Sequence, residues 1–175
     1  MKIKVISVII MLSTVLCSCS KEGTALFKGN YSFKTSGSIC ARQISEPADT
    51  LLPSDVTIKL ATESGQMDIT PTGDEAMLVS MNVTGGDMLV YNAQVDGEDL
   101  IISPDTRSMT LNFPSGEESQ ILPSTIRADV AISGSGHRYD NIILFKFNCG
   151  GVFKVGDTEY EIYSSDIDCR AKLNE

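Results

Sequence analysis

Apolar and polar residues alternate with a period of two along most of the chain after residue 27. The alternation is clearest at 27–34, 56–60, 77–84, 89–95, 109–113, 128–132 and 143–149. Successive side chains of a β-strand point to opposite faces of a sheet, so this period predicts strands with one buried and one solvated face. No window of a dozen residues shows the 3.6-residue period of an amphipathic helix. The chain is therefore predicted to be all-β.

Glycine-containing turn signals divide these strands at intervals of about ten residues. They fall at 72–74, 85–86, 96–97, 134–136 and 150–151. Short connections of this kind join antiparallel neighbours. We expect a single domain with one antiparallel β-barrel of about 8–10 strands, and a β-sandwich is the alternative. The proline-containing stretches 44–54 and 114–123 are predicted to be surface loops.

The N-terminus has the pattern of a secretory signal. Lys2 and Lys4 precede a mostly apolar run at 5–16, which is too short to span a bilayer as a helix. The sequence Leu16-Cys17-Ser18-Cys19 resembles the lipobox of bacterial lipoproteins, and this resemblance implies cleavage before Cys19 and acylation of its thiol. The alternative is an ordinary secretory signal with two accidental cysteines. The expected organisation is a lipoprotein signal peptide at 1–18, a lipidated cysteine and polar tether at 19–26, and a barrel domain at 27–175.

The whole pattern resembles the calycin-like (lipocalin-like) β-barrel lipoproteins of Gram-negative gut commensals. The resemblance rests on the lipobox at Cys19, the opening Phe27-Lys28-Gly29-Asn30-Tyr31, and the Gly134-Ser135-Gly136 turn before the strand 141–147. Lipocalins place a Gly-x-Trp motif in the first strand, and Tyr31 stands where that Trp would close the barrel end. The resemblance implies a lipid-anchored protein of the cell envelope, expected in the outer membrane. Whether the domain faces the periplasm or the cell surface stays open.

Charge and histidine content exclude several classes of function. The chain has 23 acidic and 14 basic residues, a formal net charge of −9. A nucleic-acid partner needs a basic surface, so we expect none. The single histidine, His137, is expected in a polar hairpin rather than in a catalytic triad. The carboxylates at 96–99 and 166–168 are too few for a calcium loop. We therefore predict no catalytic residues, no metal site, no cofactor and no enzymatic activity.

Methionine is frequent in the predicted strands, at Met67, Met77, Met81, Met88 and Met109. Methionine fills irregular cores and also suits adaptable apolar pockets. In a barrel we expect a ligand cavity lined by Phe33, Met77, Met81 and Phe145, whereas in a sandwich the same residues would only complete the core.

Two covalent features are also predicted. Cys149 and Cys169 are candidates for a disulfide, which an extracytoplasmic compartment permits, and two buried free thiols are the alternative. Asp49-Thr50-Leu51 lies in a proline-bounded loop and resembles a short signal for O-glycosylation in the same lipoprotein group, which makes Thr50 the candidate acceptor.

Two functions follow from these expectations. The first is a non-enzymatic envelope lipoprotein, attached to the membrane by lipid on Cys19, that binds a small apolar or amphipathic ligand in the barrel. The second is a structural or protein-partner module with a filled core and no ligand. An internal cavity favours the first, and a filled core with an exposed apolar patch favours the second.

Overall fold

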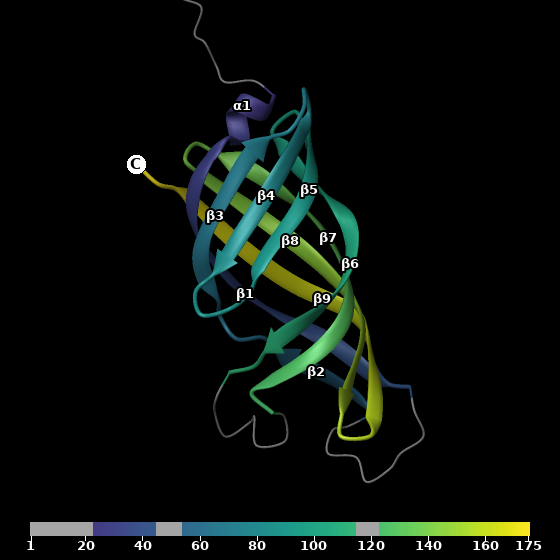
Figure 1. The fold of residues 1–175 in the computed structure, drawn as a ribbon. Coiled ribbons are helices and arrows are strands. Elements are labelled where there is room, and N and C mark those ends of the chain that lie inside the picture. The colour runs from purple at the N-terminus through teal and green to yellow at the C-terminus, as the bar shows by residue number, and fades with distance from the viewer. Residues whose placement is uncertain (1–22, 45–53, 115–122) are drawn as a thin grey trace, which may run out of the picture.

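The computed structural model describes residues 23–44, 54–114 and 123–175, and it is nearly all strand. One helical turn, α1, precedes nine strands (Figure 1). Their bounds are α1 Thr24–Phe27, β1 Gly29–Gln43, β2 Asp55–Lys59, β3 Ser64–Pro71, β4 Ala76–Val83, β5 Met88–Asp96, β6 Asp99–Asn112, β7 Thr125–Tyr139, β8 Ile142–Val155 and β9 Thr158–Leu173.

Eight of the strands close into an antiparallel barrel. The hydrogen-bonded order is β1-β3-β4-β5-β6-β7-β8-β9, and β9 pairs back onto β1 from Tyr31↔Leu173 to Gln43↔Tyr160. The extra strand β2 pairs with the second half of β1, at 38–42. Full closure removes the two edges that a sandwich would leave. The predicted all-β barrel is confirmed, and the sandwich alternative is wrong.

Three of the predicted turns are confirmed, and two are wrong. The signals at 72–74, 85–86 and 96–97 connect successive strands from β3 to β6. Gly134 and Gly136 lie inside β7, and Gly150 and Gly151 lie inside β8. A Cβ on Gly136 would come within 2.4 Å of the Phe145 ring, so this glycine makes room for an aromatic core residue. Gly151 has φ 146° and lies at a break in the β8–β9 register.

The upper end of the barrel, as oriented in Figure 1, is covered by α1. Phe27 and Tyr31 are fully buried there. The Tyr31 hydroxyl donates a 2.7 Å hydrogen bond to the Phe27 carbonyl and accepts one of 3.3 Å from Arg138 Nη1. Leu26 of α1 also packs against the buried core.

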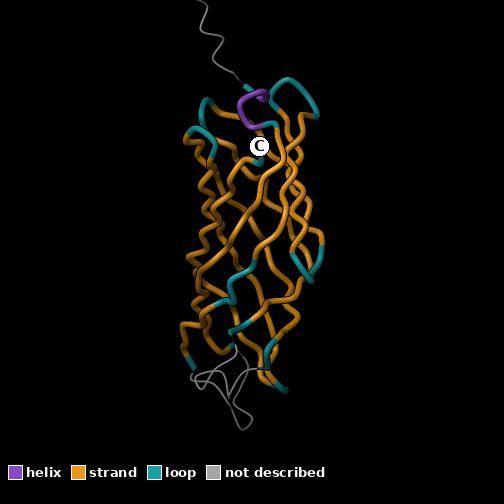
Figure 2. Tube along the Cα trace, turned by 90° about the vertical axis from the view of Figure 1, so that its left-hand side faces the viewer, coloured by secondary structure: helices purple, strands orange, loops and turns teal. Residues whose placement is uncertain are grey.

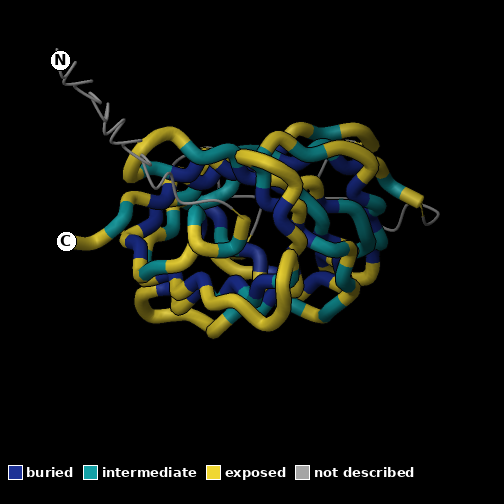
Figure 3. Tube along the Cα trace, turned by 90° about the horizontal axis from the view of Figure 1, so that it is seen from above, coloured by how far each residue is buried: buried dark blue, intermediate teal, exposed yellow. Residues whose placement is uncertain are grey.

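The strands that continue toward the lower end are longer than those that stop midway. β1, β6, β7, β8 and β9 have 14 to 16 residues, whereas β3, β4 and β5 have 8 or 9. In a side view, strands run along most of the length of the barrel (Figure 2). Below the short strands, the wall is continued by the segment after β2, where Ala61 N–H donates to the Asn112 carbonyl at 2.8 Å. Seen from above, buried positions alternate with exposed ones around this wall (Figure 3). One side of the wall is incomplete where the short and long strands part.

Candidate functional site: an opening in the barrel wall

β5 and β6 separate soon after the hairpin that joins them. They pair at only four positions, from Ala93↔Ile102 to Asp96↔Asp99. β6 nevertheless continues to Asn112 and stays paired with β7 over its length, with one register shift between Ile102 and Asp105. Pro104 lies in that shift, where a proline fits because it has no N–H to offer a neighbouring strand. The result is a gap between 88–90 of β5 and 107–112 of β6, which we call the side opening.

Main-chain groups of β6 face this opening without a strand partner among the described residues. Residues of a strand alternate in the direction of their N–H and C=O groups. Asn112 directs its carbonyl to Ala61, away from β7, so Thr110 and Ser108 direct theirs the same way. The alternate residues, Met109 and Leu111, direct their main-chain groups toward β7 instead. Ser108 and Thr110 therefore present four main-chain hydrogen-bonding groups to the side opening.

Arg107 closes the upper limit of the side opening. Its Nη2 donates to the Val90 carbonyl on β5 at 2.7 Å, and its guanidinium lies 4.7 Å from the centre of the Tyr91 ring. Asp105 accepts hydrogen bonds from the same guanidinium. A cation over an aromatic face and a carboxylate pair both favour this position. Arg107 thereby joins the two strands where the ladder between them has ended.

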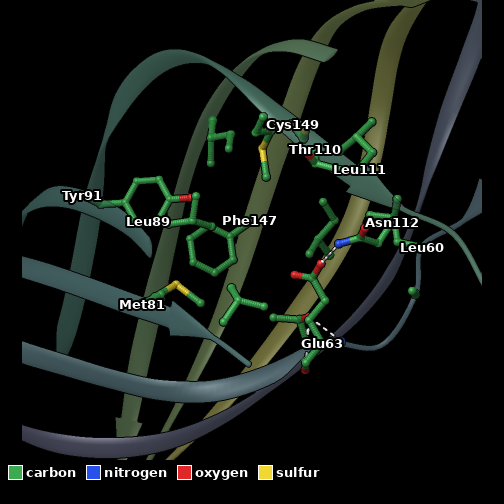
Figure 4. Close-up of a pocket in the computed structure, with 16 residues that line it drawn as sticks. Leu60, Glu63, Met81, Leu89, Tyr91, Thr110, Leu111, Asn112, Phe147 and Cys149 are labelled. Atoms are coloured by element: carbon green, nitrogen blue, oxygen red, sulfur yellow. Dashed lines mark hydrogen bonds between the residues drawn. The ribbon is translucent and has the colours of Figure 1, made fainter. Parts of the chain in front are cut away.

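An apolar pocket of about 100 Å³ lies behind the side opening (Figure 4). Its wall comes from strands on both sides of the barrel and from the segment between β2 and β3. The lining side chains are mostly apolar: Leu60, Ala61, Met81, Val83, Leu89, Tyr91, Met109, Leu111, Ile132, Phe147, Cys149 and Ile167, with the polar Thr35, Glu63, Thr110 and Asn112. A cavity of about 150 Å³ with apolar walls takes up a benzene ring, so this pocket fits a somewhat smaller apolar group.

Tyr91 and Glu63 each bring a polar group into this mostly apolar wall. The Tyr91 ring packs at 6.0 Å from Phe147, and within the described chain no hydrogen bond reaches its hydroxyl. Figure 4 shows that hydroxyl directed toward the middle of the pocket residues. Burial raises the pKa of Tyr91 to about 12, so the phenol stays protonated and able to donate. Glu63 carries the second polar group, a carboxylate that accepts a 2.5 Å bond from the Asn112 amide.

A wider, more polar space adjoins the pocket on its outer side. It has a volume of about 290 Å³. It shares six lining residues with the pocket, and 85–87 and Thr125 complete its lining; the shared residues are Glu63, Val83, Leu89, Met109, Thr110 and Asn112. Glu63 and Asp87 are its ionisable groups, and among the described residues neither forms an ion pair with a lysine or arginine. An apolar inner space thus continues into an acidic outer one.

Of the four residues predicted to line a cavity, the structure brings only Met81 to the pocket. Phe33, Met77 and Phe145 are buried in the core instead. All three side chains are at most 3% exposed. Phe145, for instance, stacks on Phe147 at 5.7 Å and fills the room above Gly136. The cavity therefore lies to the side of the barrel axis, where the wall opens.

The predicted disulfide between Cys149 and Cys169 is not formed, and both are buried free thiols. Cys169 pairs with Phe145 on β8, four residues before Cys149. Four residues of a strand span about 13 Å, well beyond the Cα separation of up to about 7 Å that a disulfide allows. Burial raises the pKa of Cys149 to about 11 and that of Cys169 to about 12, so both are unreactive as thiolates at neutral pH.

The remaining predicted residues lie elsewhere. Cys19 and Thr50 are outside the described residues. His137 lies in β7, near the hairpin after it, and its Nδ1 donates to Asp99 Oδ1 at 2.7 Å. In the described ranges no group of three or more His, Cys, Asp or Glu side chains could hold a metal ion. The same residues include no helix long and apolar enough to cross a membrane.

No protein-family model and no curated protein matches the sequence. The architecture itself, a closed antiparallel barrel of eight strands, is consistent with a calycin-like fold.

Sequence reasoning missed Glu63, Tyr91, Leu89 and Arg107. The alternation at 89–95 predicts Leu89 and Tyr91 on one strand face, but strand periodicity does not say which buried positions have space beside them. Pro104 was the available signal, because a proline inside a strand pattern indicates an edge or a bulge. It marks the point where β6 leaves β5.

Proposed function

We propose that this protein is an envelope lipoprotein, anchored by lipid on Cys19, that binds a small amphipathic ligand at the side opening without catalysing a reaction. The observation that carries the proposal is the apolar pocket of about 100 Å³ that opens through the barrel wall into an acidic outer space. An apolar end of the ligand would occupy the pocket. A hydrogen-bonding or cationic end would lie near Glu63 and Asp87.

The tether fixes how the domain would sit on a membrane. The first described element, α1, begins at Thr24, five residues after Cys19, and it covers the upper end of the barrel. Five residues span at most about 18 Å, so the upper end would lie close to the lipid surface. Two or three acyl chains hold a protein on a membrane stably. The side opening is in the wall below that end, and the ligand would enter it from the aqueous side.

Primary alkylamines of increasing chain length test the proposal. Each added CH₂ that enters the pocket contributes about 0.8 kcal/mol, so affinity should rise about fourfold per carbon. The rise should stop after about four or five carbons, since a cavity of 150 Å³ takes the six carbons of benzene. The measurement is isothermal titration of the purified protein in lipid nanodiscs, which avoids competition from detergent.

Two tryptophan variants provide the matched control. Leu89 lines the pocket, whereas the adjacent Met88 is 67% exposed and is not among the lining residues. Leu89→Trp fills the pocket and should abolish the dependence on chain length, and Met88→Trp should keep it. Equal effects of the two substitutions, or no dependence on chain length in the unsubstituted protein, would contradict the proposal.

A further inference from the structure

We infer that the ligand of the side opening is an extended peptide segment, which adds to the free edge of β6 and inserts one apolar side chain into the pocket. This inference rests on the proposed function and names the chemical class of its ligand. A protein segment that pairs with a sheet edge gains its affinity from main-chain hydrogen bonds and its specificity from side-chain pockets.

The edge of β6 at the side opening is available for pairing with another strand. Ser108 and Thr110 direct their N–H and C=O groups into the side opening, where within the described ranges no strand pairs with them. Natural edges are usually blocked by prolines, charges or a covering segment. Here Pro104 and Arg107 block only the upper part of the β6 edge, and Ala61 pairs only with Asn112. Between these limits β6 has no charged residue of its own, and the nearest cation given by a contact is Arg127 of β7, whose Nε donates to the Ser108 hydroxyl at 3.0 Å.

The outer space beside this edge of β6 can hold an added strand. The outer space of about 290 Å³ is lined by Thr110 and Asn112 of β6 and lies next to the pocket. A strand added to β6 would run about 4.8 Å from it, through this space. Alternate side chains of such a strand point inward, and the inward direction from this position leads to the pocket. At about 100 Å³ the pocket fits one aliphatic side chain rather than a longer ligand.

The ionisable groups that line the outer space are acidic. Glu63 and Asp87 flank the outer space, and among the described residues neither has a cationic partner. The whole chain carries a formal charge of −9. A peptide with lysine or arginine beside its apolar residue is therefore favoured over an acidic one, both at the site and during approach. The occupant is thus a short basic segment of another protein, in an extended conformation, with one aliphatic anchor.

The test uses three peptides and the whole protein in nanodiscs. The parent is Thr-Lys-Thr-Leu-Thr-Lys-Thr, acetylated and amidated at its ends. The second peptide carries N-methyl groups on the leucine and on the residue after it, which removes one donor that faces β6 in either register. The third replaces both lysines by glutamate. We expect the parent to bind at least tenfold more tightly than either of the other two and than butylamine, as measured by isothermal titration.

Amide hydrogen exchange locates the peptide. Bound parent peptide should slow exchange at Ser108 and Thr110 at least tenfold and leave Met109 and Leu111 unchanged, because the latter two already face β7. Equal binding of the parent and N-methylated peptides would overturn strand addition. Binding of alkylamines without any peptide would also overturn it, while the proposed function would stand.

Three further outcomes would also overturn the inference. If neither amines nor peptides bind, both the inference and the proposed function fail. If Ser108 and Thr110 are protected without peptide in a concentration-dependent manner, the edge is covered by a second copy of the chain, which would overturn the inference. Tighter binding of the glutamate peptide would overturn the charge argument on which the basic segment depends.

Discussion

At the scale of single residues, the interior is shaped by where side chains are absent as much as by where they are present. Gly136 faces Phe145 across the β7–β8 pair, and a Cβ there would lie 2.4 Å from two carbons of the ring. Gly150 on β8 has no such constraint, since its nearest neighbour would be the Ile162 carbonyl at an ordinary 3.6 Å. The two glycines therefore have different roles in the same pair of strands.

Gly136→Ala is expected to destabilise the barrel by about 1–3 kcal/mol, because Phe145 must move within a packed core. Gly150→Ala should change the free energy of unfolding by less than about 0.5 kcal/mol. Urea unfolding followed by circular dichroism measures both. Similar midpoints for the two variants would show that Phe145 has room that the structure does not give it.

At the scale of strands, the sequence predicts well which segments form strands and predicts poorly where each strand begins and ends. The clearest period-two segments lie in six of the eight barrel strands, because one face of each is buried, and none of them lies in β3 or β9. Period-two alternation could not separate a turn glycine from a glycine that faces an aromatic residue on the next strand, so 134–136 was misplaced. It also predicted buried positions such as Met77 and Phe145 without saying which of them border empty space. That depends on strand lengths and register, which are properties of pairs of strands.

The site illustrates the same limit. Met81 could be predicted as an inward-facing residue, and it does line the pocket. The opening beside it arises because β5 ends its pairing with β6 after four positions. Pro104 lies where the strands part, but a single proline in a sequence does not state which neighbour the strand leaves.

At the scale of the whole molecule, burial of ionisable groups makes stability dependent on alkaline pH. The pKa values of Cys149 and Cys169 are raised to about 11 and about 12 from an ordinary value near 9. The unfolded chain therefore loses these protons first as the pH rises above 9, and deprotonation favours the unfolded state. The contribution of the two protonated thiols to the free energy of unfolding is therefore fully present below pH 9, and it is lost progressively above pH 9.

Between pH 8 and pH 10 we expect the free energy of unfolding to fall by on the order of 1 kcal/mol for each buried thiol. The double variant Cys149→Ala/Cys169→Ala should flatten this decline, whereas Cys40→Ala, which keeps both buried thiols, should not. Denaturant titrations at several pH values measure the slope. A decline that is the same in all three proteins would mean that these thiols do not titrate as buried groups.

The central claim is that the side opening holds a ligand in a lipid-anchored barrel. Mass spectrometry of the protein isolated from its source membrane, under native and then denaturing conditions, tests it most directly. We predict a denatured mass equal to the chain from Cys19 to Glu175 plus acyl groups. Under native conditions a discrete further mass should accompany the unsubstituted protein and Met88→Trp, and be absent from Leu89→Trp. An unsubstituted protein without the further mass, or a Leu89→Trp variant that retains it, would contradict the claim.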